Sequence, residues 1–557
     1  MADFETTTNP DDCRVWGYGI MDVFEHEIYG IGNDMDEFMG FLEDIKSDVY
    51  FHNLRFDGSF IVNWLYRNGY TYSQSPYPGS FNTTISTMNQ WYKIQIVYDL
   101  DVRGRLIHTT IFDSLKKLPF KVSEIAEMYN LSIRKGDIDY TADREPGHML
   151  TAEEEAYIYN DIHIMAQALK TNFMTGLHGM TIGSDALRDF KTGITNDQFK
   201  RMYPVLETSI DEDIRKAYRG GFTWLNPEHA SERIQGGVTY DVNSLYPYIM
   251  YDRHLPYGLP VYFDGEYEYD EEYPLFIQHI KLVFDIKEDH IPTIQIKKMG
   301  LFFKDTEYLE SSDGMEVDLY VTNVDLKLIK DHYDCEYIIY ESGWKFKQTH
   351  GIFKEYIDKW TKVKVQSSGG KKLQAKLMLN NLYGKFATNP DVTGNIPIMD
   401  EEDKLEFVEG PEEMKDPVYT ALGVFITSYA RDYTIRTAQA CYDRIIYCDT
   451  DSIHLTGYEV PDAIKDNIDA NKLGFWGYEG SFTRGKYLRA KTYIQQGIIN
   501  DKDEYIDHNV ICAGMPDNIK ELVTYDNFEI GFHAEGKLIP RQVPGGVVLE
   551  SRYFTIK

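Results

Sequence analysis

The sequence predicts a multidomain protein that combines α/β and α+β units. The chain has 557 residues, more than one hydrophobic core supports, so several domains are expected. Short apolar runs typical of strands alternate along the chain with longer runs of helical periodicity. Hydrophobic residues make up 43% of the chain and aromatic residues 14%, a composition that fills cores and differs from that of a disordered protein.

Residues 1 to about 180 are predicted to form a mixed α/β domain. The predicted strands include WGYGIMDVF, YKIQIVYDL and LIHTTIFDSL, and the predicted helix is TAEEEAYIYNDIHIMAQALK. The segment YRGGFTWLNPEHA, at 218–230, carries a Gly pair and a Pro and is predicted to be a loop between domains.

The rest of the chain is predicted to form a second body with two insertions. GGVTYDVNSLYPYIM predicts a strand that runs into a helix, and 253–350 has the short strands and the Tyr, Pro and acidic content of an inserted α+β subdomain. Residues 352–387 predict two helices separated by SSGG, and 388–420 predict a second, acidic insertion. TALGVFITSYARDYTIRTAQACYDR then predicts a helix that leads into the strand-like segment 444–457.

Membrane and exported functions are not expected. No apolar run approaches roughly 18 residues. The start, MADFETTTNPDD, has neither the basic residues nor the apolar stretch of a signal peptide. The five cysteines are scattered and lack C-x-x-C spacing, which favours reduced thiols in a cytoplasm over disulfides or a zinc site.

The net charge alone argues against a polyanion as partner. It is −32, whereas proteins that bind phosphate backbones usually carry an excess of Lys and Arg. Charges farther away than a Debye length of roughly 8 to 10 Å are screened, however, so the local charge decides. Residues 345–385 hold ten lysines against Glu355 and Asp358. This stretch is therefore a candidate for binding phosphates.

One candidate metal site is formed by acidic residues of the first domain. Asp3 and Glu5 alternate on a predicted strand and share one face. Tyr157 and Asp161, four residues apart on a predicted helix, project from one side. With Asp57, these groups would suit two Mg²⁺ or Mn²⁺ ions about 3.5 to 4 Å apart that act on a phosphodiester. Each aspartate by itself is more commonly a solvated or capping residue; the ordered set is improbable by chance.

A second candidate site combines Asp241 with Asp449 and Asp451. Asp241 lies near the end of an apolar strand, and the pair lies in RIIYCDTDSIHLTG between apolar flanks. If this segment is a β-hairpin, the pair shares a face, and Asp241 would complete a carboxylate nest that needs divalent cations. The alternative is a turn whose aspartates only accept hydrogen bonds from backbone amides.

Between these acidic residues lies a predicted helix with a lysine face. Lys372, Lys376, Asn380 and Tyr383 recur at helical spacing and share one side. Such a face would suit a triphosphate followed by a stacked base. An ordinary amphipathic helix with a solvated lysine edge is the alternative.

Six short motifs, in order, resemble those of family B DNA polymerases. DVNSLYP, KLMLNNLYG and YCDTDS resemble polymerase motifs A, B and C, and DFE, NLRFD and YIYND resemble the motifs of the 3′-5′ proofreading exonuclease. Through YRGGF, KTYIQ and QVPGGVVL, the likeness extends over nearly the whole chain to the protein-primed polymerases of small Bacillus phages, the phi twenty-nine type. It implies a DNA-dependent, strand-displacing polymerase with proofreading.

The resemblance also implies the domain order. An RNase H-like exonuclease domain is followed by a right-hand polymerase of palm, fingers and thumb with two insertions. The implied boundaries are exonuclease 1–182, palm 183–252 and 421–512, first insertion 253–351, fingers 352–387, second insertion 388–420 and thumb 513–557. In the family the first insertion contacts the terminal protein, and the second gives strand displacement and processivity.

For the polymerase site, the resemblance implies roles residue by residue. Asp241 and Asp451 would bind two metal ions, with Asp449 beside them and Val242 contributing. The implied nucleotide contacts are Val242, Tyr246, Lys364, Lys372, Lys376, Asn380 and Tyr383, with Tyr246 under the sugar and Tyr383 with Asn380 checking the new base pair. The implied DNA contacts are Lys491 and Tyr493 on the primer, Thr427 and Arg431 on template or primer, and the loop residues Tyr218, Gly220 and Gly221, which balance synthesis against editing.

For the exonuclease site, the implied metal ligands are Asp3, Glu5, Asp57 and Asp161. Tyr157 and Lys135 would assist them. The implied contacts to a frayed single strand are Thr6, His52, Asn53, Phe56, Ser114 and Leu115.

The implied cofactors are two Mg²⁺ ions per active site, with Mn²⁺ as a substitute, and the substrates are dNTPs. The implied partners are primer-template DNA, single-stranded DNA and a terminal protein that serves as primer. The protein would act as a monomer or as a heterodimer with that terminal protein, in the cytoplasm of an infected bacterial host.

Three features depart from the family pattern. Asn381 stands where motif B usually has Ser, which would alter nucleotide affinity or fidelity. The chain begins only two residues before DFE, so a short, frayed first strand is expected. The chain is also more acidic than its relatives.

Two other functions fit parts of the sequence. One is a stand-alone metal-dependent exonuclease whose C-terminal part only binds DNA; the intact second carboxylate set and the lysine helix argue against it. The other is a non-enzymatic scaffold for a terminal protein; the four ordered exonuclease carboxylates argue against that.

The acidity predicts tolerance of salt, as an adaptation to a saline environment in which acidic residues lie away from the DNA channel. In a primer-extension assay titrated with KCl, activity should persist to higher salt than in a near-neutral relative. Loss of activity at the same salt concentration as the relative would contradict the hypothesis.

Overall fold

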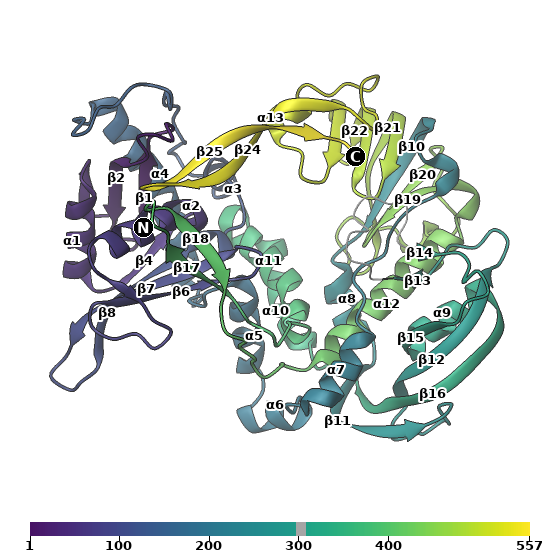
Figure 1. Ribbon diagram of the computed structural model, residues 1–557. Helices are drawn as coiled ribbons and strands as arrows, with labels where there is room; N and C mark the ends of the chain where they lie inside the picture. The colour runs from purple at the N-terminus through teal and green to yellow at the C-terminus, as the bar shows by residue number, and fades with distance from the viewer. Residues whose placement is uncertain (297–307) are drawn as a thin grey trace.

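The computed structural model describes residues 1–296 and 308–557. Figure 1 shows an N-terminal domain on the left and a larger body on the right, bridged above by a long C-terminal hairpin. The predicted combination of α/β and α+β units in several domains is confirmed. Residues 297–307 of the predicted first insertion lie outside the described residues.

The N-terminal domain contains two sheets. One is three-stranded and antiparallel in the order β1-β2-β3, and the other has the order β4-β8-β7-β6-β5. Helix α4 packs against β1 and β2, which fixes its position relative to the first sheet. The elements are β1 (Ala2–Thr6), β2 (Val15–Met21), β3 (Ile28–Gly32), α1 (Met35–Ile45), β4 (Asp48–Phe51), α2 (Leu54–Arg67), β5 (Thr71–Tyr72), β6 (Ser80–Ile85), β7 (Trp91–Leu100), β8 (Leu106–Asp113), α3 (Val122–Met128) and α4 (Ala152–Met174).

The expectation of a frayed first strand is wrong. Strand β1 pairs with β2 along its length, and the ammonium group of Met1 donates a 2.8 Å hydrogen bond to the carbonyl of Met21. Phe4 packs edge-on against Phe38 and Phe51, with ring centroids 4.8 and 5.0 Å away. Burial of this aromatic ring anchors the strand although it is short.

The larger body is organised around a seven-stranded sheet in the order β23-β22-β21-β10-β20-β19-β9. Helices α8 and α12 pack against each other, and α12 also covers β19 and β20. The predicted strand-to-helix segment and the helix before 444–457 are both present. The elements are α5 (Ile182–Thr192), α6 (Asn196–Met202), α7 (Thr208–Lys216), β9 (Thr223–Leu225), β10 (Arg233–Val242), α8 (Leu245–Asp252), α12 (Thr420–Gln439), β19 (Ile445–Asp449), β20 (Ser452–Thr456), β21 (Trp476–Arg489), β22 (Thr492–Asn500) and β23 (Tyr505–Cys512).

The two insertions differ in structure. The described part of the first is a four-stranded antiparallel sheet, in the order β11-β16-β12-β15, with helix α9 against it. The second is a β-hairpin that follows two antiparallel-packed helices. The elements are β11 (Leu255–Asp264), β12 (Leu275–Ile286), β13 (Ile294–Gln295), β14 (Tyr308–Leu309), β15 (Val317–Thr322), α9 (Asn323–His332), β16 (Tyr333–Thr349), α10 (Lys354–Gln366), α11 (Gly369–Phe386), β17 (Asn395–Met399) and β18 (Leu405–Glu409).

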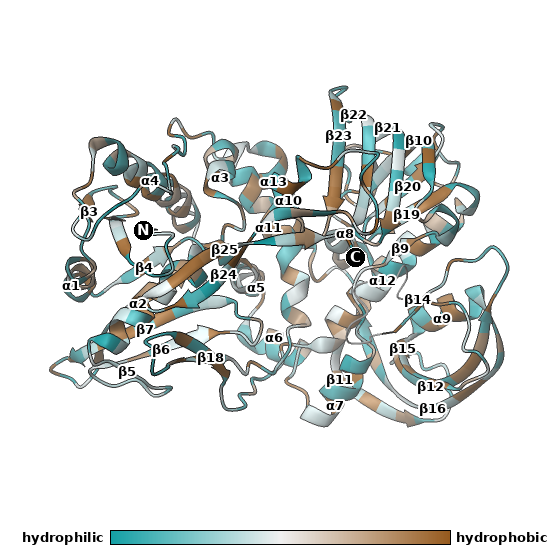
Figure 2. Cartoon of the chain, turned by 45° about the horizontal axis from the view of Figure 1, so that its top comes forward, coloured by the Kyte–Doolittle hydropathy of each residue, from teal (hydrophilic) through white to brown (hydrophobic). Residues whose placement is uncertain are grey.

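The C-terminal hairpin, β24 (His533–Val543) and β25 (Gly546–Thr555), follows the short helix α13 (Asp517–Lys520) and reaches back to the N-terminal domain. Figure 2 shows the apolar character of β25 and α4, in brown, against the polar loops in teal. Near the hairpin tip, Gln542 donates to the hydroxyl of Ser59 at 3.1 Å, and Gly546 lies against the ring of Phe60. The backbone approaches that ring so closely that a Cβ on Gly546 would lie 2.4 Å from it.

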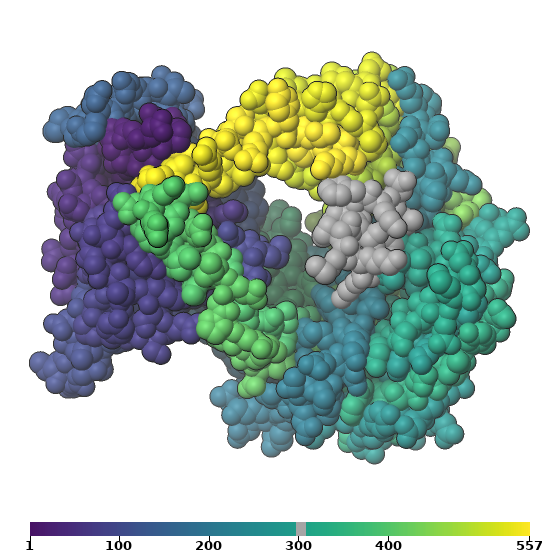
Figure 3. All heavy atoms as spheres, viewed as in Figure 1, coloured from purple at the N-terminus to yellow at the C-terminus, as the bar shows by residue number. Residues whose placement is uncertain are grey.

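The hairpin β17–β18 also reaches the N-terminal domain. Tyr66 donates a 2.7 Å hydrogen bond to the carbonyl of Pro397, and Asn63 donates to the carbonyl of Asp403 at 3.1 Å. Strands β18 and β24 lie beside each other. Figure 3 shows an opening through the molecule with the yellow C-terminal hairpin above it and the green β17–β18 hairpin to its left. We call these two hairpins the arms.

Candidate active sites

The first site, which we call the central-sheet site, lies where β10 meets the turn between β19 and β20. Asp241 on β10 pairs with Ser452 on β20, and the amide of Val242 donates a 2.8 Å hydrogen bond to the carbonyl of Asp451. Burial and the charge of Asp451 raise the pKa of Asp241 to about 8. Burial also raises the pKa of Asp451, to about 6, with Asp449 adding to the effect. The carboxylates are thus close enough to repel each other.

The expected common strand face for Asp449 and Asp451 is wrong. Asp449 ends β19, whereas Asp451 lies in the turn itself. The amide of Asp451 donates to the carbonyl of Asp449 at 2.7 Å, and Thr450 between them has φ 60°, which is the geometry of a γ-turn. The chain reverses between the two aspartates, so the alternation of a strand does not apply to them.

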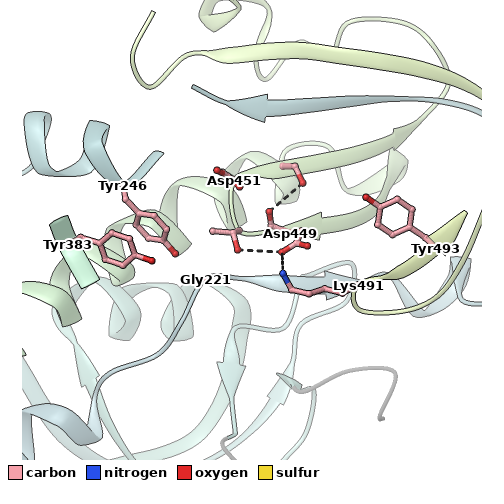
Figure 4. A pocket seen from close by; sticks show the side chains of 9 residues that line it. Gly221, Tyr246, Tyr383, Asp449, Asp451, Lys491 and Tyr493 are labelled. Atoms are coloured by element: carbon pink, nitrogen blue, oxygen red, sulfur yellow. Dashed lines mark hydrogen bonds and ion pairs between the residues drawn. The ribbon is translucent and has the colours of Figure 1, made fainter. Parts of the chain in front are cut away.

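Asp449 is held by neighbours on two strands and in the turn between β21 and β22. Its carboxylate accepts hydrogen bonds from the hydroxyl of Thr223 at 3.1 Å and that of Tyr447 at 3.2 Å, and it forms an ion pair with Lys491 at 3.1 Å. Figure 4 shows Lys491 pointing at Asp449, with Asp451 directed elsewhere. The charge of Asp449 is therefore offset by Lys491, whereas the charge of Asp451 acts on Asp241.

Two tyrosines stack at the side of this site. The rings of Tyr246 and Tyr383 lie 4.0 Å apart with planes at 21°, one from α8 and the other from α11. They line a pocket of about 580 Å³ with Gly221, Asp449, Asp451, Lys491 and Tyr493 (Figure 4). Such a pocket offers an aromatic platform beside carboxylates. Val242 has a fully buried side chain, so only its backbone is available to a ligand.

The predicted lysine face borders the same site. Lys372, Lys376 and Asn380 are exposed on α11. Lys364, on α10, lies 3.3 Å from the hydroxyl of Ser244. Burial lowers the pKa of Lys364, and the charges of Lys376 and Lys372 lower it further, so the three ammonium groups are neighbours. The charges of Lys376 and Lys364 lower the pKa of Asp241 and so offset part of the rise. Both ammonium groups therefore lie near its carboxylate.

Asn381, the departure from the usual motif, turns its side chain away from this face. Its amide group donates a 2.8 Å hydrogen bond to the carbonyl of Leu377, one turn earlier in the same helix. The amide is thus occupied within α11.

The second site, which we call the N-terminal site, gathers the four predicted carboxylates. Oxygens of Asp3, Glu5 and Asp161 lie within 4.8 Å of one another. Burial raises the pKa of Asp3 to about 7, with Asp161 adding to it, and raises that of Glu5 to about 9, with Asp3 adding to it. Buried Asp57, on α2, has its pKa raised well above the usual value by burial and then by Asp3.

Lys135 and Tyr157 adjoin these carboxylates. Lys135 forms an ion pair with Asp161. Tyr157 lies one turn before Asp161 on α4 and shares a hydrogen bond with the hydroxyl of Tyr140.

Both sites fit hard divalent cations. Their donors are carboxylate oxygens, the ligands that Mg²⁺ and Mn²⁺ prefer. Several carboxylates held together with raised pKa values form a site in which bound cations would relieve the repulsion.

Several residues expected to touch DNA make hydrogen bonds within the protein. Ser114 is fully buried and donates to the carbonyl of Phe51 at 2.9 Å, and His52 lies between Ser114 and the carbonyl of Phe120. The backbone amide of Asn53 donates to Asp113 at 3.0 Å, while its side chain is exposed. Thr6, Phe56 and Leu115 are partly exposed near this site. In this structure the hydroxyl of Ser114 holds the backbone at Phe51, and its contact with a single strand stays a prediction.

Thr427 and Arg431 likewise have their polar groups bonded within the protein. The hydroxyl of Thr427 is buried and donates to the carbonyl of Val424 at 3.0 Å. Arg431 is 3% exposed, pairs with Asp325 at 2.7 Å, and donates to the carbonyl of Gly220 at 3.0 Å. The buried guanidinium holds the carbonyls of the 218–221 loop, and its contact with template or primer stays a prediction.

That loop is tightly packed beside the central-sheet site. Tyr218 and Gly220 are half-buried, and a Cβ on Gly221 would lie 2.6 Å from the hydroxyl of Thr450. Glycine at this position allows the loop to touch the turn that carries Asp451. Tyr493 stacks on Tyr487, with ring centroids 4.9 Å apart, and so lines the pocket from the opposite side.

The sequence reasoning missed three groups. Glu479 acts on the pKa of Asp241 but sits at a β-bulge of β21, which strand alternation does not reveal. Asp325 is the partner of Arg431 across a hundred residues. Tyr140 reaches Tyr157 from a segment without helix or strand.

Comparison with known proteins shows the family to which this chain belongs. Residues 39–159 and 142–470 match the family described as DNA polymerase type B, organellar and viral. The DNA polymerase of Bacillus phage phi29 is 55% identical over 568 residues, covering 100% of this chain and 98% of that one. The chain belongs to the family B DNA polymerases. It is a DNA polymerase of the phi29 type.

Other relatives agree. The DNA polymerase of Streptococcus phage Cp-1 is 32% identical over 580 residues, covering 100% of this chain and 98% of the relative. The polymerase resembles the solved structure of phi29 DNA polymerase with primer-template DNA and incoming nucleotides, with a TM-score of 0.95, 55% identity and coverage of 100% and 99%. The structure of phi29 DNA polymerase with single-stranded DNA matches with a TM-score of 0.95, 54% identity and the same coverage. Among the described residues of the polymerase, no helix has the length and apolar character needed to span a membrane.

The raised carboxyl pKa values predict how the metal-free polymerase responds to pH. A group whose pKa is higher in the folded than in the unfolded protein stabilises the fold at low pH, and this contribution is lost as pH passes through the folded value. With a chelator present, Tm should therefore fall as pH rises from about 4, the usual carboxyl range, to about 9, as Asp451, Asp3, Asp241 and Glu5 ionise in turn in the folded protein.

Two controls sharpen this measurement. Glu5→Gln should flatten the fall at the alkaline end, whereas the same change at exposed Glu25 should not. Added Mg²⁺ should recover Tm at alkaline pH. A Tm that rises with pH in chelator would show that the carboxylates do not repel each other as described.

Proposed function

We propose that this polymerase extends DNA primers at the central-sheet site and removes mismatched 3′ ends, by 3′-5′ exonuclease activity, at the N-terminal site. The observation that carries the proposal is the presence of two separate carboxylate clusters, one with Lys364 and Lys376 beside it and the other with Lys135. A polymerase that lacked editing would have no need of the second cluster.

Each site is proposed to hold two Mg²⁺ ions, or Mn²⁺ in their place. The ligands would be Asp241, Asp451 and the backbone of Val242 in the central-sheet site, and Asp3, Glu5, Asp57 and Asp161 in the N-terminal site. Such ions supply an activated hydroxyl and stabilise the leaving oxygen when bound. Asp449, already paired with Lys491, would support the metal-binding residues instead of acting as an indispensable ligand.

The side chains around the central-sheet site would bind and orient the nucleotide. Lys364, Lys372 and Lys376 would neutralise the triphosphate. The stacked pair of Tyr246 and Tyr383 offers a platform for the sugar and base of an incoming dNTP, with Asn380 at its edge. Lys491 and Tyr493 line the opposite wall, where they would position the primer end.

The DNA partners are proposed from the relatives. Phi29 DNA polymerase has been solved with primer-template DNA and with single-stranded DNA. We assign the first to the central-sheet site and the second to the N-terminal site. Initiation from a terminal protein that contacts the first insertion, strand displacement by the second insertion, and action in the cytoplasm of an infected bacterium are proposed from the resemblance, with the protein as a monomer or as a heterodimer with its terminal protein.

The two activities should separate by mutation. On a primed template with Mg²⁺, Asp57→Ala should lose degradation in the absence of dNTPs yet extend when dNTPs are added. Asp451→Ala should degrade but fail to extend. Gel analysis of both variants beside the wild type distinguishes a polymerase from a stand-alone exonuclease and from a scaffold. Extension that survives in Asp451→Ala would overturn the assignment of the central-sheet site.

Asp449 and Asp451 should differ in importance. Because Asp449 is paired with Lys491 and hydrogen-bonded to Thr223, Asp449→Asn should lower the extension rate by about 10- to 100-fold, the usual cost of losing a group that supports metal ligands. Asp451→Asn should lower it much further. Single-nucleotide incorporation measures both, and equal losses would contradict the distinction.

A further inference from the structure

The 129–151 loop lies along helix α4, and three of its side chains contact α4 in reverse order. It connects α3 to α4 and contains neither helix nor strand. Lys135 meets Asp161, Tyr140 meets Tyr157, and Arg144 meets Glu154. The three partners on α4 are spaced three and four residues apart, so they share one face of the helix.

Two of these contacts belong to the N-terminal site, and the third does not. The pairs made by Lys135 and Tyr140 involve Asp161 and Tyr157 directly. Glu154 lies about two turns before Asp161, outside the carboxylate cluster. The third contact therefore adds no group to the chemistry, but it fixes the end of the loop against the first turn of α4.

The third contact is the most enclosed of the three. Arg144 is 6% exposed, and its Nε donates to Glu154 at 2.8 Å. The guanidinium lies 4.0 Å from the ring of Trp16, which is itself 2% exposed on β2. Because the guanidinium of Arg144 is paired with Glu154 and also lies on the ring of Trp16, both its position and its orientation are fixed.

Glu154 is fixed from further sides. Its other carboxylate oxygen accepts a 2.9 Å hydrogen bond from the amide of Thr151 and lies 2.8 Å from Nε2 of His148. His148 and Thr151 belong to the same loop. The carboxylate thus gathers the end of the loop onto the first turn of α4.

We propose that Arg144 and Glu154 are positioning residues that set the places of Lys135 and Tyr140 in the N-terminal site. This inference rests on the proposed exonuclease activity of that site. A loop of this length without regular structure samples many conformations unless it is tied down. With Arg144 released, Lys135 would still be present but would be held less often against Asp161.

A double-mutant cycle tests whether Arg144 acts through Lys135. The variants are Arg144→Gln, Lys135→Ala and the double mutant, with degradation of single-stranded DNA measured as kcat and KM. Arg144→Gln should lower kcat by about 10- to 100-fold with little change in KM, because a small displacement of a positioned group costs this much. In the Lys135→Ala background the same change should cost less than about threefold. Arg144→Lys should lie between, since it keeps the charge but loses the flat contact with Trp16.

Two controls separate positioning from loss of charge and from misfolding. Arg134→Gln removes an exposed positive charge from the same loop and should leave kcat near that of the wild type. Primer extension with dNTPs should stay near the wild-type rate in Arg144→Gln. Hydrogen exchange of residues 131–142 should become faster in Arg144→Gln but not in Arg134→Gln.

The inference is overturned if the losses from Arg144→Gln and Lys135→Ala multiply, if Arg134→Gln costs as much as Arg144→Gln, or if exchange of 131–142 is unchanged. If the wild type does not degrade single-stranded DNA, the proposed exonuclease activity fails. The exchange measurement then still decides whether Arg144 positions the loop.

Discussion

Repulsion between carboxylates that are held together in two sites is the constraint on which the rest of this structure depends. Asp241 on β10 and Asp451 in the turn between β19 and β20 come together from segments some two hundred residues apart, and Asp3, Glu5 and Asp161 meet from a strand and a helix. Charges of one sign gather in this way only when the surrounding fold holds them. The seven-stranded sheet, the buried start of β1 and the packing of α4 all contribute to that restraint.

Each cluster is accompanied by lysines from elements outside it. Lys135 comes from a loop, Lys491 from a turn between strands, and Lys364 and Lys376 from two helices. Their separate origins allow each lysine to be placed without altering the strands that carry the aspartates. They offset part of the repulsion while leaving carboxylate oxygens for cations and phosphates.

Periodicity predicted the features that depend on the geometry of a single helix or strand. The alternation of Asp3 and Glu5, the helical spacing of Tyr157 and Asp161, and the lysine face of α11 all follow from local geometry, and the structure has them. The turn between Asp449 and Asp451 and the bulge at Glu479 were missed because both interrupt the strand period on which the reasoning relied.

Residue identity did not predict the contacts that several side chains make within the protein. Arg431, Thr427 and Ser114 lie in motifs that resemble those of DNA-binding relatives, yet their polar groups are satisfied within the protein. Which way a side chain points depends on partners such as Asp325, more than a hundred residues away in the chain. A motif therefore identifies a neighbourhood more reliably than a contact.

The two arms rest on the N-terminal domain through single hydrogen bonds that involve Gln542, Tyr66 and Asn63, and through apolar side chains, among them Leu405, Val543 and Val547, that are buried in the core of that domain. Each hydrogen bond is worth roughly 0.5 to 1.5 kcal/mol, and the buried apolar side chains add to this, so both arms are held firmly against the domain. A strand that passes through the opening could slide along its own length, but it could leave sideways only if the two arms moved apart. Retention of that kind is topological and does not require strong attraction, which suits a chain whose net charge is −32.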